Sequence, residues 1–201
     1  MSIKHSMKRS SWIWGLAWLA LAGCQPEPES NHDAASDVTR PRAEQLVQFR
    51  AGLPEATVLA GGTASRDELV ERWVAAVAAA DTTTVQRLLL DRAEFAWLFY
   101  PTSAQALPPY DLPPGLLWDM LSRQSNGGME YVFRRWNDRE PRLESYDCGT
   151  EPVAEGDNLI HGPCVMRIVV DGGDTVAARL TGPIIERAGM FKFVSYTNDL
   201  D

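Results

Sequence analysis

The sequence contains few residues of the kinds that bind metals or act as nucleophiles. Its 201 residues include three histidines, and only His32 and His161 follow residue 23. His32 lies in a polar stretch, so His161 is the single imidazole expected in the folded part. There is no HExxH, no paired CxxC, no glycine-rich phosphate loop and no GxSxG elbow. We interpret His161 as a surface or strand-end residue beside Gly162-Pro163, and we expect no metal and no cofactor.

Long apolar runs are also lacking. The basic residues Lys4, Lys8 and Arg9 precede an apolar run of eleven residues, 12–22. This run is too short for a transmembrane helix, which needs about 20 residues. A basic start, a short apolar run and small residues after it are typical of a secretory signal peptide.

The apolar run ends in Leu21-Ala22-Gly23-Cys24. This motif resembles the lipobox of bacterial lipoproteins, in which the cysteine is acylated and becomes the new N-terminus. The alternative is an ordinary signal peptide followed by a chance cysteine. Each buried methylene contributes about 0.8 kcal/mol, so two or three acyl chains anchor a protein stably. Because Gln25, and not aspartate, follows the cysteine, the resemblance implies the outer membrane, facing the periplasm, if the cell has two membranes.

Residues 25–42 have hardly a large apolar side chain, so they cannot bury enough surface to offset the entropy of ordering. We therefore predict a signal peptide at 1–23, a lipidated cysteine and flexible tether at 24–42, and a single domain at 43–201. A domain of about 155 residues can bury a core of its own.

Positive charge, and lysine above all, is scarce. The chain has 19 basic and 27 acidic residues, and three of the basic ones lie in the expected signal peptide. The mature protein then has 16 basic against 27 acidic residues, a net charge of −11, with Lys192 as its only lysine. This balance argues against nucleic acid as a partner, because phosphate contacts need a basic surface. It also opposes adhesion to anionic lipid and leaves acyl chains to hold the protein at the membrane.

Three cysteines are present, and lipidation would use Cys24. The other two, Cys148 and Cys164, belong to a chain that we expect in an oxidising compartment, which predicts a disulfide. The alternative is two buried reduced thiols. A hairpin that made these residues face each other would centre on Gly156, within the turn-rich residues 155–158, and this agreement supports both the hairpin and the bond.

Helical patterns fill the first part of the domain. Ser65 and Glu68 form a capping-box signature before apolar residues at helical spacing, and Trp73 is expected on the core face of that helix. Four prolines at 102–114 indicate a loop, and we expect Gly127-Gly128 to end the helix that follows it. The other helices are expected at 42–53, 82–90, 92–100, 114–125 and 131–136.

After Pro141 the periodicity changes to that of strands, which are expected at 143–148, 159–170, 175–186 and 190–196. Residues 171–174, Asp-Gly-Gly-Asp, predict a hairpin turn. Its two aspartates lack the further oxygen ligands of a calcium loop. Helices followed by about four antiparallel strands define an α+β fold.

This order of elements resembles that of the nuclear transport factor 2-like proteins, also called ketosteroid isomerase-like or cystatin-like, over residues 65–201. The resemblance implies N-terminal helices packed on a curved antiparallel sheet, with a pocket between the concave face and the helices. Some members of that family are isomerases or dehydratases. Their catalytic pattern has no residue-by-residue match in this sequence, so the catalytic residues stay unknown.

Six residues are candidates for a ligand pocket. Two arginines interrupt apolar strands, two tyrosines lie in strands, and two aromatic residues lie in the helical region: Arg167, Arg179, Tyr146, Tyr196, Trp118 and Tyr131. A tight two-residue loop at Gly172-Gly173 would put the two arginines on opposite faces of the sheet. A register shifted by one residue would make them face each other, and we favour it because it gives the cleaner apolar face. We expect both arginines on the outer, solvated face; an inward pair would instead form a clamp for a carboxylate or phosphate.

The sequence favours a membrane-anchored, non-catalytic envelope lipoprotein whose domain binds a protein, peptidoglycan or a small ligand. The alternatives are a small-molecule enzyme of the isomerase or dehydratase kind and a structural or assembly lipoprotein. An enclosed pocket with a carboxylate of raised pKa would favour the enzyme. A filled interior with exposed apolar residues would favour a protein partner.

Overall fold

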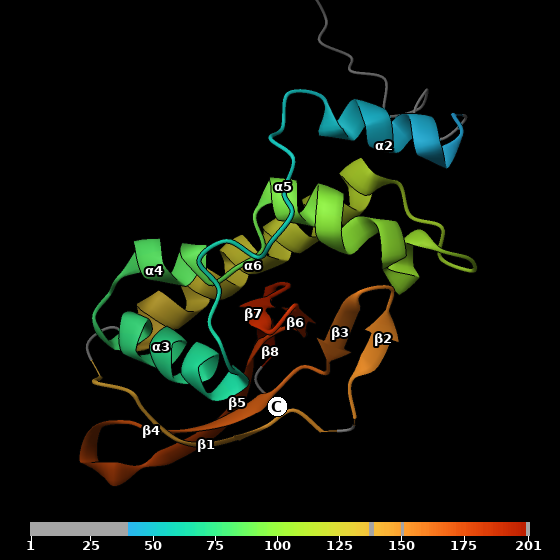
Figure 1. Cartoon of the computed structure of the whole chain (residues 1–201). Coiled ribbons are helices and arrows are strands. Elements are labelled where there is room, and N and C mark those ends of the chain that lie inside the picture. Colours follow the sequence, from blue (N-terminus) through green and yellow to red (C-terminus); the bar gives the residue numbers. More distant parts are fainter. Residues whose placement is uncertain (1–39, 137–138, 150, 200–201) are drawn as a thin grey trace, which may run out of the picture. The chain divides into compact units, whose positions relative to one another are not determined.

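The helices come first in the chain and the strands follow, which confirms the predicted α+β fold (Figure 1). The computed structural model describes residues 40–136, 139–149 and 151–199; the expected signal peptide, Cys24 and most of the tether lie outside this range. The helical elements are α2 (Arg42–Arg50), α3 (Arg66–Ala78), α4 (Thr82–Arg87), α5 (Arg92–Glu94), the π-helical turn η1 (Phe95–Phe99), the 3-10 turns η2 (Tyr100–Thr102) and η3 (Ala104–Ala106), α6 (Pro114–Trp136), and the 3-10 turn η4 (Asp171–Gly173) between two strands. The strands are β1 (Arg142–Asp147), β2 (Val153–Glu155), β3 (Asn158–His161), β4 (Val165–Val169), β5 (Thr175–Thr181), β6 (Ile184–Arg187), β7 (Met190–Phe193) and β8 (Tyr196–Asp199).

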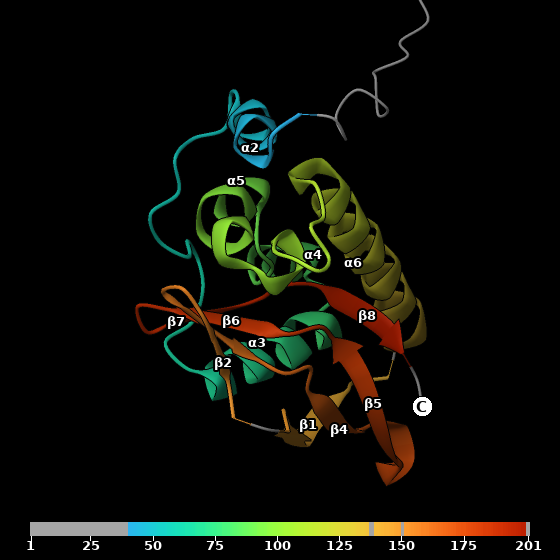
Figure 2. The same ribbon diagram turned by 90° about the vertical axis from the view of Figure 1, so that its right-hand side faces the viewer.

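The strands form two antiparallel sheets, with the orders β1-β4-β5-β8 and β2-β3-β6-β7. Both sheets have the order of one four-stranded meander, because β1 continues into β2, β3 into β4, β5 into β6, and β7 into β8. The predicted sheet of about four strands is thus present as four long strands, each interrupted once where the chain passes from one sheet to the other (Figure 2). We call this line of interruptions the bend.

Two of the interruptions are glycine-proline pairs that fall inside the predicted strands. Gly162-Pro163 separates β3 from β4, and Gly182-Pro183 separates β5 from β6. The predicted strands at 159–170 and 175–186 are therefore too long, because proline has no N–H for a sheet ladder. A Cβ on Gly162 would lie 3.0 Å from the Cys148 carbonyl oxygen, so glycine is needed for this close approach.

The predicted disulfide between Cys148 and Cys164 is present, with a Cα–Cα distance of 3.9 Å. In the β1–β4 ladder Tyr146 faces Met166 and Asp147 faces Val165, so the two cysteines are the next facing pair. The turn at Gly156 is also where the sequence predicts it, although it joins β2 to β3 and not the cysteine-bearing strands directly. The disulfide therefore closes the first hairpin at the bend.

The turn between β4 and β5 corrects both predicted registers. Met166 faces Ala178 and Arg167 faces Ala177, so Arg167 faces neither Ala178 nor Arg179. The first expectation assumed a two-residue turn at Gly172-Gly173, and the favoured one shifted the pairing by one residue toward Arg179. In the structure Asp171 also belongs to the loop, and the Val170 N–H donates to the Asp174 carbonyl oxygen (2.9 Å). The resulting register places Arg167 and Arg179 on the face opposite to the buried Met166 and Ala178.

The helix cap at Ser65 is confirmed in part. The Ser65 hydroxyl accepts a hydrogen bond from the Glu68 N–H (3.1 Å), but the Glu68 carboxylate accepts from the N–H of Ala64 and not from that of Ser65. Trp73 of this helix is 1% exposed, as predicted. Its ring lies 6.3 Å from Phe193 and 6.0 Å from Tyr196 between ring centroids.

Large side chains fill the space between the helices and the strands in two clusters. The sheet core, between α3, α6 and mainly the β1-β4-β5-β8 sheet, includes Trp73, Trp136, Ile168, Leu180 and Tyr196. The helical core, around α5, η1 and the beginning of α6, includes Phe95, Phe99, Leu117, Ile185 and Val194. Among the described residues, no helix has the length and apolar character needed to cross a membrane.

Helix α6 is continuous, which corrects the prediction that Gly127-Gly128 ends it. The helix lies along β8 (Figure 2). Gly128 is buried at this contact, and a Cβ there would lie 2.8 Å from the backbone nitrogen of Thr197. The glycine therefore permits close packing of helix on strand rather than a break.

We expect Gly128→Ala to lower the free energy of unfolding, because the added carbon meets backbone that cannot move without disturbing β8. Gly127→Ala is the matched control: nothing lies within 4 Å of its added carbon. There, alanine should raise stability by about 1 kcal/mol through its higher helix propensity. Urea unfolding measures both, and equal effects at the two positions would contradict close packing of α6 on β8.

Candidate functional site

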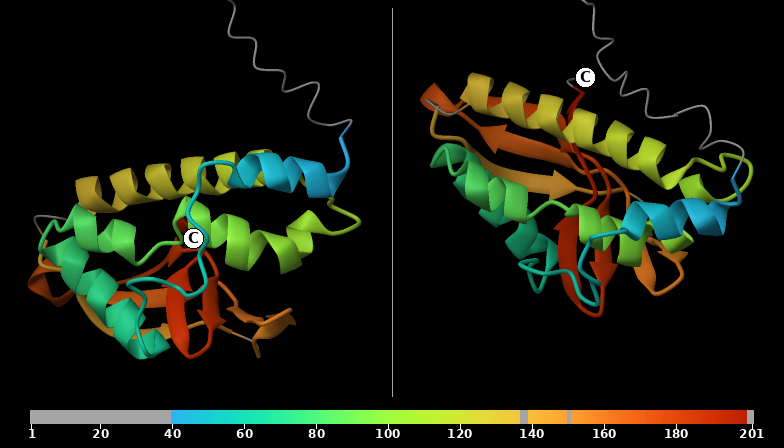
Figure 3. Two further views of the ribbon diagram at one scale, coloured as in Figure 1. Left: turned by 45° about the horizontal axis from the view of Figure 1, so that its top comes forward. Right: turned by 90° about the horizontal axis from the view of Figure 1, so that it is seen from above.

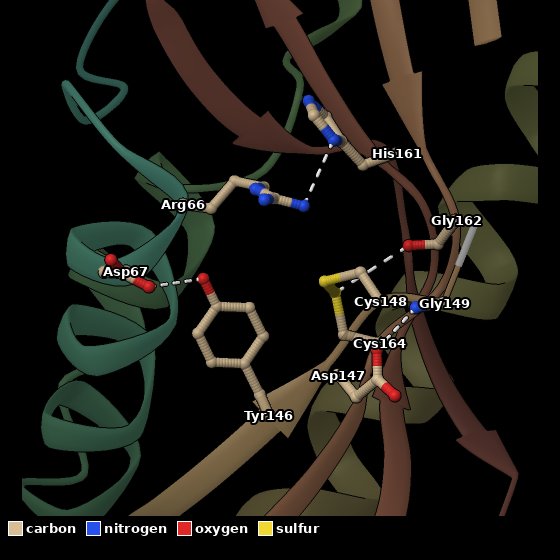
Figure 4. Close-up of a disulfide and its surroundings, with 9 residues drawn as sticks. All are labelled: Arg66, Asp67, Tyr146, Asp147, Cys148, Gly149, His161, Gly162 and Cys164. Atoms are coloured by element: carbon tan, nitrogen blue, oxygen red, sulfur yellow. Dashed lines mark hydrogen bonds between the residues drawn. A yellow bond between two sulfur atoms is a disulfide. The ribbon is translucent and has the colours of Figure 1, made fainter. Parts of the chain in front are cut away.

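Polar side chains gather where the chain crosses the bend, beside the beginning of α3. Arg66 and Asp67 come from the first turn of α3, Tyr146 from β1, His161 from the end of β3 and Glu186 from β6. We call these five residues the bend cluster. Figure 4 shows Arg66 reaching toward His161, and Tyr146 toward Asp67, with the Cys148–Cys164 disulfide nearby.

His161 is buried, with 5% of its surface exposed, so the prediction of a surface histidine is wrong although its place at a strand end is right. Its Nε2 lies 2.8 Å from a carboxylate oxygen of Glu186, and its Nδ1 lies 3.3 Å from Nη1 of Arg66. A guanidinium can only donate, so Nδ1 accepts and Nε2 carries the hydrogen that Glu186 accepts. Both ring nitrogens are engaged, and this histidine joins α3 to β6.

Tyr146 fastens the same helix to the other sheet. Its hydroxyl donates to the Asp67 carboxylate at 2.5 Å. Burial, and the carboxylate of Asp67 next to it, raise the pKa of Tyr146 to about 12. The phenol is therefore protonated at neutral pH and acts as a donor that holds α3 against β1.

The disulfide at the centre of this region is buried, with Cys164 0% and Cys148 7% exposed. The sulfur of Cys164 lies 3.7 Å from the Gly162 carbonyl oxygen. A disulfide sulfur has no hydrogen to donate, so this is a packing contact. The bond serves as a structural link between β1 and β4.

The six predicted pocket residues do not lie together. Tyr146 belongs to the bend cluster, whereas Tyr196 is buried in the sheet core and donates its hydroxyl to the Val85 carbonyl oxygen (2.5 Å). Burial raises the pKa of Tyr196 well above its ordinary value. Trp118 packs on Phe95 of the helical core, with ring centroids 5.2 Å apart. These three side chains therefore have different surroundings.

The arginines of that prediction lie on the outer face of their sheet. Arg167 is exposed and its Nε pairs with the Glu144 carboxylate at 3.1 Å. Arg179 is half-buried, and its Nε has no hydrogen-bond partner among the described residues. This placement agrees with the expected solvated face and gives no inward clamp.

Tyr131 lines an open cleft of about 350 Å³ together with Arg134, Arg135 and Arg139. A second open cleft, of about 480 Å³, lies between α3 and the beginning of β1. Its lining residues are Glu71, Val74, Ala75, Pro141, Arg142, Leu143 and Glu144. Both clefts are surface hollows and neither contains a histidine or cysteine.

A buried ion pair is the feature that sequence reasoning missed. Lys192 Nζ donates to the Glu94 carboxylate (2.7 Å) and to the Ala60 carbonyl oxygen (3.0 Å), and the two charged side chains are 3% and 1% exposed. Glu94 also accepts from the N–H groups of Ala60 (2.6 Å) and Asp91 (2.9 Å). Burial raises the pKa of Glu94, and the hydrogen bond from Lys192 opposes this shift. The signal was Lys192 itself, the single lysine after residue 8 of the sequence, set between two phenylalanines of a strand.

Both carboxylate oxygens of Glu94 already accept hydrogen bonds from within the protein, so Glu94 does not face an open pocket. The ion pair links β7, α5 and the segment before Thr63. Among the residues that can be described, no three His, Cys, Asp or Glu side chains are grouped so that they could hold a metal ion.

The comparisons with known proteins add no family. No family model matches the chain, and no curated protein and no solved structure is significantly similar to it. A functional proposal therefore depends on the sequence and on the geometry described above.

We expect Lys192→Met to lower the free energy of unfolding by about 3–5 kcal/mol, because it leaves the Glu94 carboxylate buried without its counter-charge. Adding Glu94→Gln should restore part of this loss, since a neutral amide costs less to bury. Arg123→Met is the control: it removes the exposed Arg123–Asp119 pair and should cost about 0–1 kcal/mol. If urea unfolding gives similar losses for Lys192→Met and Arg123→Met, the buried pair does not contribute in this way.

Proposed function

We propose that this protein is a bacterial envelope lipoprotein, held to a membrane by acyl chains on Cys24, whose domain binds an envelope protein without catalysing a reaction. Support for the anchor comes from the lipobox-like Leu21-Ala22-Gly23-Cys24 after a short apolar run. The Cys148–Cys164 disulfide is consistent with an oxidising compartment. Gln25 favours the outer membrane, facing the periplasm, where the cell has two membranes.

The hydrogen bonds and ion pairs of the buried polar side chains support the non-catalytic part of the proposal. The one imidazole of the domain has both nitrogens engaged. Burial raises the pKa of two carboxylates, of which Glu94 is paired with a lysine and Glu155 accepts a hydrogen bond from the Ala104 N–H. The sheet core and the helical core fill the space between helices and strands with large side chains. The two clefts described above are open hollows. These features favour recognition at the surface over a small-molecule enzyme.

An open sheet edge is the observation that carries the choice of a protein partner. Among the described residues, β1 and β2 pair on one side only, with β4 and β3, and they lie at the same edge of the meander. At the other edge, bridges from Thr63 and Leu89 partly cover β7. Unpaired backbone groups of an edge strand can take up an extended segment of another protein. Val153 at the start of β2 is 61% exposed, as an apolar contact for such a segment requires.

The anchor is tested at Cys24. We expect Cys24→Ser to leave a form that is uncleaved or soluble and that no longer enters the detergent phase, because the acylated side chain is gone. Mass spectrometry of the wild-type mature N-terminus should find an acylated cysteine at position 24. An unmodified cysteine there, or cleavage at another position, would contradict the anchor.

The binding edge is tested by crosslinking in intact cells. A photo-crosslinking amino acid in place of Val153 should capture a discrete envelope protein, because that side chain lies beside the open edge. The same substitution at Val58, which is 58% exposed but on the loop before Leu59, is the matched control. Equal products at the two positions, or none at Val153, would contradict binding at β2.

A further inference from the structure

The segment between η3 and α6 ends in an exposed apolar turn. Leu107, Pro108, Pro109 and Tyr110 are all exposed, with Leu107 at 49% and Tyr110 at 66%. The Tyr110 N–H donates to the Leu107 carbonyl oxygen (3.1 Å), so these residues form a closed turn and not an extended polyproline strand. We call residues 107–110 the apolar tip.

The apolar tip is fastened to the beginning of α2 by Arg42. One guanidinium nitrogen donates to the Tyr100 hydroxyl (3.1 Å), and the other pairs with the Asp111 carboxylate (2.6 Å) and donates to the Asp111 carbonyl oxygen. The Tyr100 hydroxyl, on a side chain that is 1% exposed, donates to the Leu112 carbonyl oxygen (2.8 Å). The tip is therefore held at the residue with which α2 begins. Figure 3 shows the segment projecting beside that end of the helix in both views.

Other exposed apolar side chains concentrate on the elements around the tip. Leu116 and Met120, one turn apart on α6, are 48% and 51% exposed, and Val47 on α2 is 70% exposed. With Leu107 and Tyr110 they make five of the nine large hydrophobic side chains that are exposed in the described part of the chain. Helix α2 packs against α6, and α6 against η3, so these residues belong to one end of the domain.

The same end receives the chain from Cys24. Only 18 residue steps separate Cys24 from Arg42, so the tip's point of attachment stays within about 60 Å of the acylated residue even if that chain is fully extended. A tether of this length gives effective concentrations in the millimolar range for a second contact. A weak affinity of the tip for the surface that holds the acyl chains is then enough to populate the contact.

We propose that the apolar tip inserts into the lipid surface to which the protein is anchored, an inference that rests on the proposed lipid anchor. Leucine and proline present apolar surface, and tyrosine places an apolar ring and a polar hydroxyl at the boundary between acyl chains and headgroups. The net charge of the mature chain opposes electrostatic adhesion, so the contact is an apolar one. It fixes which end of the domain faces the membrane.

The test uses the whole lipidated protein in vesicles of phosphatidylethanolamine and phosphatidylglycerol. Acylation and the disulfide use all three native cysteines, so one added cysteine can be labelled with an environment-sensitive fluorophore. Leu107→Cys and Tyr110→Cys place the label on the tip. Thr175→Cys, exposed on β5 near the turn to β4, is the control, because Figure 3 shows that hairpin at the opposite end from the tip.

We expect the emission of both tip labels to shift to the blue in vesicles and to be quenched by spin-labelled lipid, whereas the label at Thr175 stays unchanged. Protein that floats with the vesicles but gives the same emission at all three positions would overturn the inference and leave the anchor standing. Protein that does not float would overturn the anchor itself. A shift that appears without vesicles as protein concentration rises would assign the tip to a second copy of the chain and likewise overturn the lipid contact.

Discussion

At the bend, each of the four long strands leaves one sheet and enters the other, and most other features of the domain depend on that line. Gly162-Pro163 and Gly182-Pro183 interrupt two of the ladders there, and the Cys148–Cys164 bond ties the first hairpin at the same place. A Cβ on Gly182 would collide with Ser195 of the neighbouring strand, as one on Gly162 would crowd the Cys148 carbonyl. Small residues are therefore required where the strands come closest, and the two sheets can present different faces to the helices.

The bend also determines what the polar residues of the domain do. It brings the end of β3 and the middle of β6 to the beginning of α3, where Arg66, His161 and Glu186 bind one another in series. On the other side of the helix start, Asp67 accepts the hydroxyl hydrogen of Tyr146. These contacts hold α3 to both sheets. The polar side chains of the bend cluster therefore attach the helix to the strands. The surface features that our proposals use are the open edge at β1 and β2 and the apolar tip.

The sequence predicted the features that short-range patterns decide. The disulfide followed from the cysteine count and the expected export, with support from residue numbering around one turn. The buried face of α3 followed from helical spacing with Trp73 at its centre. The predictions were wrong or incomplete where a residue's role depends on a part of the chain that is distant in the sequence. Gly128 looks like a helix breaker until Thr197 of β8 is known to lie against it. The Lys192–Glu94 pair joins residues 98 positions apart, and no local pattern connects them. The β4–β5 register depended on whether Asp171 belongs to the turn: Arg167 faces Ala177, one residue from the tight-loop expectation and two from the favoured one.

The two exposed surfaces are linked through the short β2–β3 hairpin. Asn158 donates its amide to the Leu98 carbonyl oxygen (2.8 Å), and Glu155 accepts from the N–H of Ala104 (3.3 Å), so the hairpin is bound to the segment that leads to the apolar tip. A protein strand added to β2 would therefore lie near the base of the tip. Helix α6 extends away from this region for 23 residues, about 35 Å, and ends at the cleft with Arg134, Arg135 and Arg139. If the tip lies in the lipid, the partner binds close to the membrane surface while the arginine end of α6 extends away from it. Anchoring, insertion and binding at β2 would then act at the same end of the domain, and losing the lipid contact should weaken capture of the partner even when β2 is unchanged.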